Sequence, residues 1–122
     1  MKLLSSLSTQ DKIKLAAELD GYYVDTGSML YDGAVIPWTI YTSKDGARFN
    51  STDSRFQYAV SYDAIIPLVQ KLWAADICLS GDFTSALKQV RGWHTISLIE
   101  MMTASPSELL DALLVTTRKA VL

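Results

Sequence analysis

The sequence predicts an α+β fold of the sandwich type, in which helices pack on a mostly antiparallel sheet within a single compact domain, residues 1–122. The length of 122 residues suits one hydrophobic core, since single domains usually hold ~100–200 residues. Apolar residues make up 49% of the chain, which is typical of a folded globular protein. Helical patterns stand at the beginning, middle and end, with β-forming segments between them.

Three helices are expected. The first spans Thr9–Asp20, where an apolar stripe follows a serine N-cap and ends at a glycine. The second begins at Ser61 and carries apolar residues at intervals of three and four. The third has the clearest start, because Ser105–Glu108 combines an N-cap serine, a first-turn proline and a glutamate that can reach back to the cap. We expect it to run to about Arg118.

Segments of β-forming residues separated by turn residues predict two or three antiparallel strands between the first two helices. Asp32-Gly33 is the strongest hairpin signal, because a two-residue type I′ turn needs positive φ at both positions. Pro37 lacks an N–H, so the strand Val35–Tyr41 either lies at an edge or starts to pair only after Trp38. The expected strands are Tyr22–Val24, Met29–Tyr31 and Val35–Tyr41, with turns at Asp25–Gly27, Asp32-Gly33 and Lys44–Gly46 and a polar loop at Asn50–Ser54.

The segment Asp76–Gly92 fits two interpretations. Ile77–Leu79 has the composition of a strand, whereas the apolar residues between Phe83 and Val90 fit a short helix about as well as a bulged strand. We predict a strand here. The following residues, Trp93–Met102, are apolar on both alternating faces, which predicts an interior strand.

Charge and hydropathy exclude several classes of function. The 11 basic and 13 acidic residues give a net charge of −2, which disfavours a nucleic-acid binder and equally an acidic DNA mimic. No apolar run approaches the ~18 residues of a membrane helix, and the first residues lack the apolar core of a signal peptide. The single cysteine, Cys78, is expected to be a buried small hydrophobe. These features favour a cytoplasmic setting.

Recognised catalytic motifs do not occur in the sequence. His94 is the only histidine, no Cys or His pair has metal-ligand spacing, and no glycine-rich phosphate loop or Gly-x-Ser-x-Gly elbow is present. We therefore expect no catalytic residue, no metal and no cofactor. An enzyme built from Tyr62, Asp63 and His94 is the least favoured hypothesis, because nothing in the sequence shows that these residues converge.

Aromatic residues gather in the first half of the chain, on or beside the expected hairpins. If helices cover only one face of the sheet, alternate strand residues stay exposed, and Tyr and Trp are frequent anchors of protein interfaces. Cross-strand packing in the core is the competing interpretation. The candidate partner-binding residues are Tyr23, Tyr31, Trp38, Tyr41, Tyr62 and Trp93.

Two segments resemble small bacteriophage proteins of the phage ABA-sandwich type. Tyr58–Pro67 is similar to the start of a helix in that family, and Ala104–Leu114 is similar to its Ala-Thr-Pro-x-x-Leu-Cys-x-Ala-Leu-Leu ending, with Leu110 where many relatives have Cys. The expected first helix occupies the place of the family's opening helix. The resemblance implies helices on both sides of a sheet and a phage or prophage origin, with action in the cytoplasm of a bacterial host. It supplies no catalytic residues.

The favoured hypothesis is a non-enzymatic accessory protein that binds a host or defence-system protein, for example as an inhibitor of a CRISPR nuclease. The alternative is a protein that sequesters a small molecule such as a nucleotide, using groups like Trp38, Arg48, Trp93 and His94. Nucleic acid and membrane are disfavoured as partners, and a homo-oligomer is left open.

Overall fold

The computed structural model describes residues 2–75, 79–92 and 103–122. The described part is an α+β domain with a three-stranded antiparallel sheet and a small two-stranded parallel sheet, which confirms the predicted fold class. In chain order the elements are β1 (Lys2–Leu3), η1 (Leu4–Ser6), α1 (Thr9–Leu19), β2 (Tyr23–Tyr31), β3 (Ala34–Thr42), β4 (Arg48–Asn50), η2 (Ser54–Phe56), α2 (Tyr62–Ala75), α3 (Leu79–Arg91), α5 (Pro106–Thr116) and β5 (Ala120–Val121).

Helices α1, α2 and α5 form where the sequence predicts helices, and two of them begin at side-chain caps. The Asp11 N–H donates to the Ser8 hydroxyl (3.1 Å) at the start of α1. At the start of α5 the Glu108 N–H donates to Ser105 Oγ (3.2 Å), and the Ser105 N–H donates to Glu108 Oε1 (3.0 Å). This reciprocal pair is the capping box expected from the sequence.

The prediction of a strand within Asp76–Gly92 is wrong for the residues that the structure describes, because Leu79–Arg91 forms helix α3. Phe83, Ala86 and Leu87 are buried at helical spacing, so the stripe obeys a period of 3.6 rather than 2. Ile77 and Cys78 lie outside the described residues, as does the interior strand expected at Trp93–Met102.

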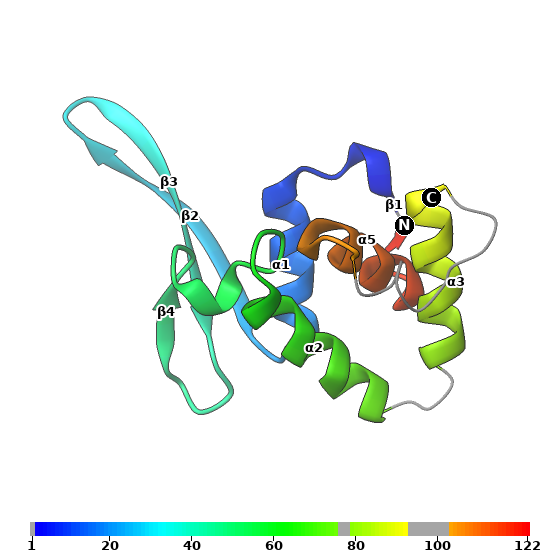
Figure 1. Ribbon diagram of the computed structural model, residues 1–122. Coiled ribbons are helices and arrows are strands. Elements are labelled where there is room, and N and C mark those ends of the chain that lie inside the picture. The colour runs from blue at the N-terminus through cyan, green and yellow to red at the C-terminus, as the bar shows by residue number, and fades with distance from the viewer. Residues whose placement is uncertain (1, 76–78, 93–102) are drawn as a thin grey trace.

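Helix α5 lies at the centre of the helical part, with α1, α2 and α3 packed around it (Figure 1). Two ion pairs join it to its neighbours: Lys12 Nζ to Asp111 Oδ1 (2.9 Å) on the α1 side and Arg91 Nε to Glu108 Oε2 (3.2 Å) on the α3 side. Five residues of α5 are buried, and they form the middle of the hydrophobic core: Leu109, Leu110, Ala112, Leu113 and Leu114.

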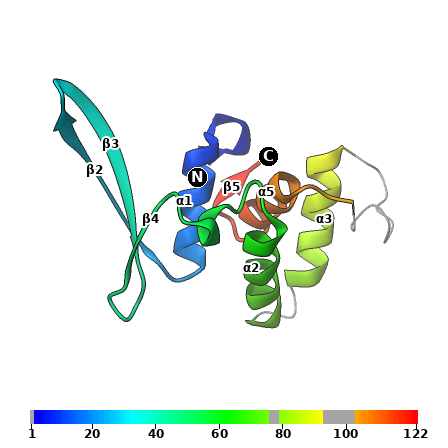
Figure 2. The same cartoon turned by 60° about the vertical axis from the view of Figure 1, so that its left-hand side comes forward.

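The long hairpin of β2 and β3 projects away from the helices (Figures 1 and 2). Its turn has φ values of 52° at Asp32 and 80° at Gly33, as the predicted type I′ turn requires. The turn expected at Asp25–Gly27 does not form, since β2 runs without interruption through these residues. Strand β3 pairs with β2 along its whole length but with β4 only at Ile40–Thr42. Pro37 therefore lies where β3 has a partner on one side only, as the edge alternative expects, and the alternative of pairing only after Trp38 is wrong because Val35 to Trp38 already pair with β2.

Candidate protein-binding hairpin

The hairpin is mounted on an aromatic cluster at its base. The Phe56 ring lies 4.9 Å from the Tyr22 ring, 4.3 Å from Tyr41 and 6.1 Å from Phe49, measured between ring centroids. The guanidinium of Arg55 lies 3.8 Å from the centroid of Phe49, a cation–π contact. Because Tyr22 precedes β2, Tyr41 belongs to β3 and Phe49 to β4, this cluster fixes the start of the hairpin against η2.

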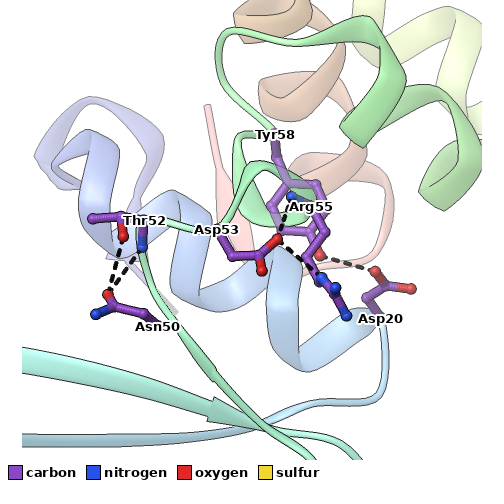
Figure 3. Close-up of polar contacts among 6 residues, drawn as sticks. All are labelled: Asp20, Asn50, Thr52, Asp53, Arg55 and Tyr58. Atoms are coloured by element: carbon purple, nitrogen blue, oxygen red, sulfur yellow. Dashed lines mark hydrogen bonds and ion pairs between the residues drawn. The ribbon is translucent and has the colours of Figure 1, made fainter.

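Polar contacts tie the same region to the helices (Figure 3). The Tyr58 hydroxyl donates to Asp20 Oδ2 (2.8 Å) at the end of α1, and Lys71 Nζ on α2 donates to Asp20 Oδ1 (3.1 Å). Burial raises the pKa of the Tyr58 phenol, and the Asp20 carboxylate raises it further, because both disfavour a second negative charge there. The base of the hairpin is therefore rigidly joined to the helical core.

Beyond this base the hairpin is exposed on all sides. We use the name arm for residues Gly27–Trp38, the part of β2 and β3 that extends past β4. Every residue from Ser28 to Pro37 is exposed, and Figure 2 shows that the arm stands clear of the helices. The large apolar side chains at its end are Met29 (53% exposed), Leu30 (78%), Tyr31 (69%), Val35 (66%) and Ile36 (41%).

The cross-strand register places most of these side chains in one continuous stripe. Directly opposite residues of an antiparallel pair share a face, so the pairs Gly27–Trp38, Met29–Ile36 and Tyr31–Ala34 lie on the same face. We call this the outer face. The opposite, inner face carries Tyr41 at the base, where it is fully buried, and Leu30 opposite Val35 near the turn.

Trp38 covers Gly27 on the outer face. A Cβ built on Gly27 would stand only 2.3 Å from Trp38 Cζ2, a separation that no real Cβ contact allows. Glycine is thus required at this position for the indole to lie flat against β2. The indole fills the outer face between the base of the hairpin and the Met29–Ile36 pair.

The arm carries no positive charge. Between Tyr23 and Thr42 the only charged residues are Asp25 and Asp32. Exposed apolar side chains together with two carboxylates suit a protein surface, whereas the phosphate backbone of a nucleic acid requires Lys or Arg.

The structure brings only some of the sequence-predicted binding residues to this surface. Tyr23 and Tyr31 are exposed on the outer face, and Trp38 is half-buried there. Tyr62 lies on α2, away from the arm, and its hydroxyl donates to the Ala104 carbonyl (2.6 Å). The prediction that Tyr41 binds a partner is corrected, because its side chain is fully buried and faces the core.

Trp93 lies outside the described residues, so its candidacy stays a prediction. Sequence reasoning missed Met29, Leu30, Val35 and Ile36, which are more exposed than Trp38. Their signal was present as apolar residues on both faces of the strands beside Asp32-Gly33. That pattern usually marks a buried strand, so it does not by itself indicate an exposed surface.

A polar cavity of about 480 Å³ lies beside the base of the hairpin, lined by Tyr22, Asp53, Ser54, Arg55, Ser61 and Asp63. Arg55 Nε already donates to Asp53 Oδ1 (3.0 Å). The pKa of the Asp53 carboxyl is lowered, more by the hydrogen bond from the Arg55 backbone N–H than by the one from the Arg55 side chain. Two carboxylates beside a guanidinium that is already paired disfavour an anionic nucleotide. Trp38 and Arg48, two of the groups expected in a nucleotide pocket, do not line this cavity, and His94 lies outside the described residues.

Within the described ranges, no three His, Cys, Asp or Glu side chains come close enough together to hold a metal ion. Nor does any helix in that part of the chain have both the length and the apolarity needed to cross a bilayer. Comparison with protein family models, with curated proteins and with solved structures finds no match for this chain.

Proposed function

We propose that this protein acts by binding another protein through its arm, without catalysis. The observation that carries the proposal is the projecting apolar surface formed by Met29, Leu30, Tyr31, Val35 and Ile36. Single exposed apolar residues are common on protein surfaces, but a contiguous group of them typically marks an interaction site. The aromatic base holds the arm in place, so little order has to be gained on binding.

The biological setting of the proposal rests on the sequence resemblance to phage ABA-sandwich proteins. In that setting the protein is a phage or prophage accessory factor, the partner is a host or defence-system protein, and binding takes place in the cytoplasm of a bacterial host. An apolar arm that reaches beyond the body of the protein suits an inhibitor, because it can occupy a groove that the partner needs for its own function.

Site-specific photo-crosslinking tests the proposal. A photoreactive phenylalanine analogue replaces Tyr31 on the arm, and in a control protein it replaces Gln89, which is exposed on α3. We expect a bacterial partner that crosslinks from position 31 and not from position 89. Binding is then measured by calorimetry between the two purified proteins.

The decisive comparison uses the double variant Leu30→Asp/Ile36→Asp, which places one charge on the inner face and one on the outer face of the arm. If the arm is the binding surface, affinity falls by ~30-fold to ~1,000-fold, the effect of losing ~2–4 kcal/mol at an interface centre. The matched control is Val60→Asp, an exposed apolar residue outside the arm, which should leave affinity unchanged. Equal affinity for the wild type and the double variant would exclude the arm as the binding surface.

A further inference from the structure

Among residues 2–75, 79–92 and 103–122, no strand pairs with the outer edge of β2. In this part of the chain the strand order β2-β3-β4 leaves β2 paired on one side only, and β2 is nine residues long. Proteins usually protect such edges with lysine, proline, a bulge or a short strand, whereas β2 has neither lysine nor proline and pairs with β3 without a bulge. Its single charged residue is Asp25. The edge is thus a long, regular template for another strand.

The hairpin geometry determines which backbone groups face this edge. In a two-residue type I′ hairpin, the residues flanking the turn form a hydrogen-bonded pair, and hydrogen-bonded and non-hydrogen-bonded pairs then alternate. Tyr31 and the other odd-numbered residues of β2 therefore direct their N–H and C=O groups toward β3. Thr39 shows the same alternation. It lies opposite Thr26, an even-numbered residue, and its carbonyl points away from β2 and accepts from the Ser51 N–H (3.3 Å) on the β4 side.

The backbone groups available at the open edge therefore belong to Val24, Thr26, Ser28 and Leu30. A second β2 in antiparallel orientation offers the same groups in return. For these groups to meet, even-numbered residues must lie opposite even-numbered residues, so the sum of the two residue numbers must be even. The register that uses the whole strand pairs Tyr23 with Tyr31, and its sum of 54 satisfies this condition.

We propose that two copies of this chain associate through β2, about a two-fold axis at Gly27. In this register Val24 lies opposite Leu30 of the second copy and Thr26 lies opposite Ser28 of the second copy. Asp25 lies opposite Met29 of the second copy and not opposite its own equivalent, so like charges do not face each other. The contact is isologous and closed, as most homodimer interfaces are.

Charge complementarity at the ends of the paired strands supports the same register. Continuing the pairing by one residue brings Asp32 of the second copy beside Tyr22. The exposed side chain of Lys44 of the first copy lies close to this point. Its Cε is 3.6 Å from where a Cβ would stand on Gly21, the residue before Tyr22. Lys71 Nζ lies 4.0 Å from the same position but is paired with Asp20, so Lys44 is the lysine that the turn aspartate of the other copy approaches.

The dimer extends the sheet to the order β4-β3-β2-β2-β3-β4 and joins the two outer faces. Opposite residues share a face, so the two apolar stripes become one continuous surface. This inference concerns the edge of β2 and its backbone, whereas the proposed function concerns the apolar side chains of the arm. Either can fail without the other.

Disulfide crosslinking reads the register directly. In a Cys78→Ala background, the variants Asp25→Cys and Met29→Cys are prepared separately with tags of different mass and are then oxidised alone and as a mixture. Residues 25 and 29 form a non-hydrogen-bonded pair across the proposed axis, with Cα atoms ~4.5 Å apart, a separation that a disulfide can span. We expect the mixture to give the mixed dimer as the main product.

Each variant oxidised alone tests a different register. Asp25→Cys homodimers as the main product would place the axis at residue 25, and Met29→Cys homodimers would place it at residue 29. Either result would overturn the proposed register, and the absence of all three products would overturn the association.

Proline substitution tests the edge without new thiols. Thr26→Pro removes an N–H that faces the open edge, so it costs no β2–β3 hydrogen bond. The matched control is Val35→Pro, because Val35 lies opposite Leu30 and its N–H faces the other side of the hairpin. Sedimentation velocity should give twice the 13.5 kDa chain mass for the wild type and for Val35→Pro.

For Thr26→Pro we expect the dimer dissociation constant to rise at least ~10-fold, while the far-UV circular dichroism stays like that of the control. A wild type that sediments as a monomer at high micromolar concentration would refute the inference. A Thr26→Pro variant that folds and dimerises like the wild type would refute it as well.

Discussion

Replacing Phe56 with alanine should detach the hairpin from the helical core. Phe56 is fully buried in the short helix η2, and its ring contacts rings from three other parts of the hairpin base: Tyr22, Tyr41 and Phe49. It also contacts Tyr58, which is bonded to α1. Truncation at this position removes the side chain that all of these groups share.

The magnitude follows from burial. Fully buried Phe→Ala substitutions cost about 3–5 kcal/mol of unfolding free energy, because apolar surface is lost and a cavity remains. A domain of this size has about 5–15 kcal/mol in total. With an m-value of about 2 kcal/mol/M in urea, the unfolding midpoint should fall by about 2 M.

Urea unfolding followed by circular dichroism measures this loss. Val60→Ala serves as the control, because Val60 lies four residues away and is 72% exposed, so its truncation should change stability by less than about 0.5 kcal/mol. Hydrogen exchange adds a local test: amides of β3 and β4 should lose protection in Phe56→Ala at the same time as or before those of α5. A shift in the midpoint no larger than that of Val60→Ala would refute the role given to Phe56.

Three further predictions follow from single contacts. Ser105→Ala removes the hydroxyl half of the α5 capping box and should lower the free energy of unfolding in urea by about 1 kcal/mol. Ser105→Asp should keep most of this stability, because aspartate is also a favourable N-cap. An unchanged stability in Ser105→Ala would contradict the capping role. The pKa of the Tyr58 phenol is raised in the folded protein, so the phenol of the unfolded chain ionises first as the pH rises above its ordinary pKa of about 10. The contribution of Tyr58 to stability is therefore constant below that pH and falls above it. Tyr58→Phe should lose less stability than the wild type between pH 8 and pH 10.5, and equal slopes of unfolding free energy against pH would refute this. Gly27→Ala should displace the Trp38 indole, whose Cζ2 would stand 2.3 Å from the new Cβ. We expect a red shift of the fluorescence emission from Trp38, which is obtained by subtracting the spectrum of the same substitution in a Trp38→Phe background. The absence of a shift would show that the indole does not cover β2.

Elements defined by local chemistry could be predicted from the sequence. The α5 start needs only Ser105, Pro106 and Glu108, and these residues act within one helical turn. The hairpin turn likewise needs only Asp32-Gly33. In both cases the residues that specify the structure lie beside each other in the chain, so no tertiary information is required.

The α3 region could not be predicted because two local signals conflict. The composition of Ile77–Leu79 favours a strand, while Phe83, Ala86 and Leu87 follow helical spacing. In the structure these three residues are buried within one helix that includes Gly81. The helical stripe outweighs the unfavourable propensity of one glycine, which costs only about 1 kcal/mol.

Exposure of the candidate site depends on tertiary packing and was therefore predicted only in part. Tyr41 and Trp38 occur on the same strand, yet one is fully buried and the other half-buried, because they point to opposite faces and only the base of the inner face is covered by η2. The sequence shows alternation but does not show how far the covering layer extends. The apolar end of the arm lies beyond that layer.

The arm can form during synthesis, before the residues that complete the core have been added. The hairpin closes through a two-residue turn, and such turns form in ~1–10 μs, whereas the core is incomplete until α5 packs against α1 and β5 pairs with β1. At ~5–20 residues per second, the ribosome adds Thr116 about 4 to 15 seconds after Thr42. During this interval the apolar arm can already form on a nascent chain without a folded body. Chaperones, and the arms of neighbouring nascent chains on the same messenger, therefore meet this surface before the completed protein does.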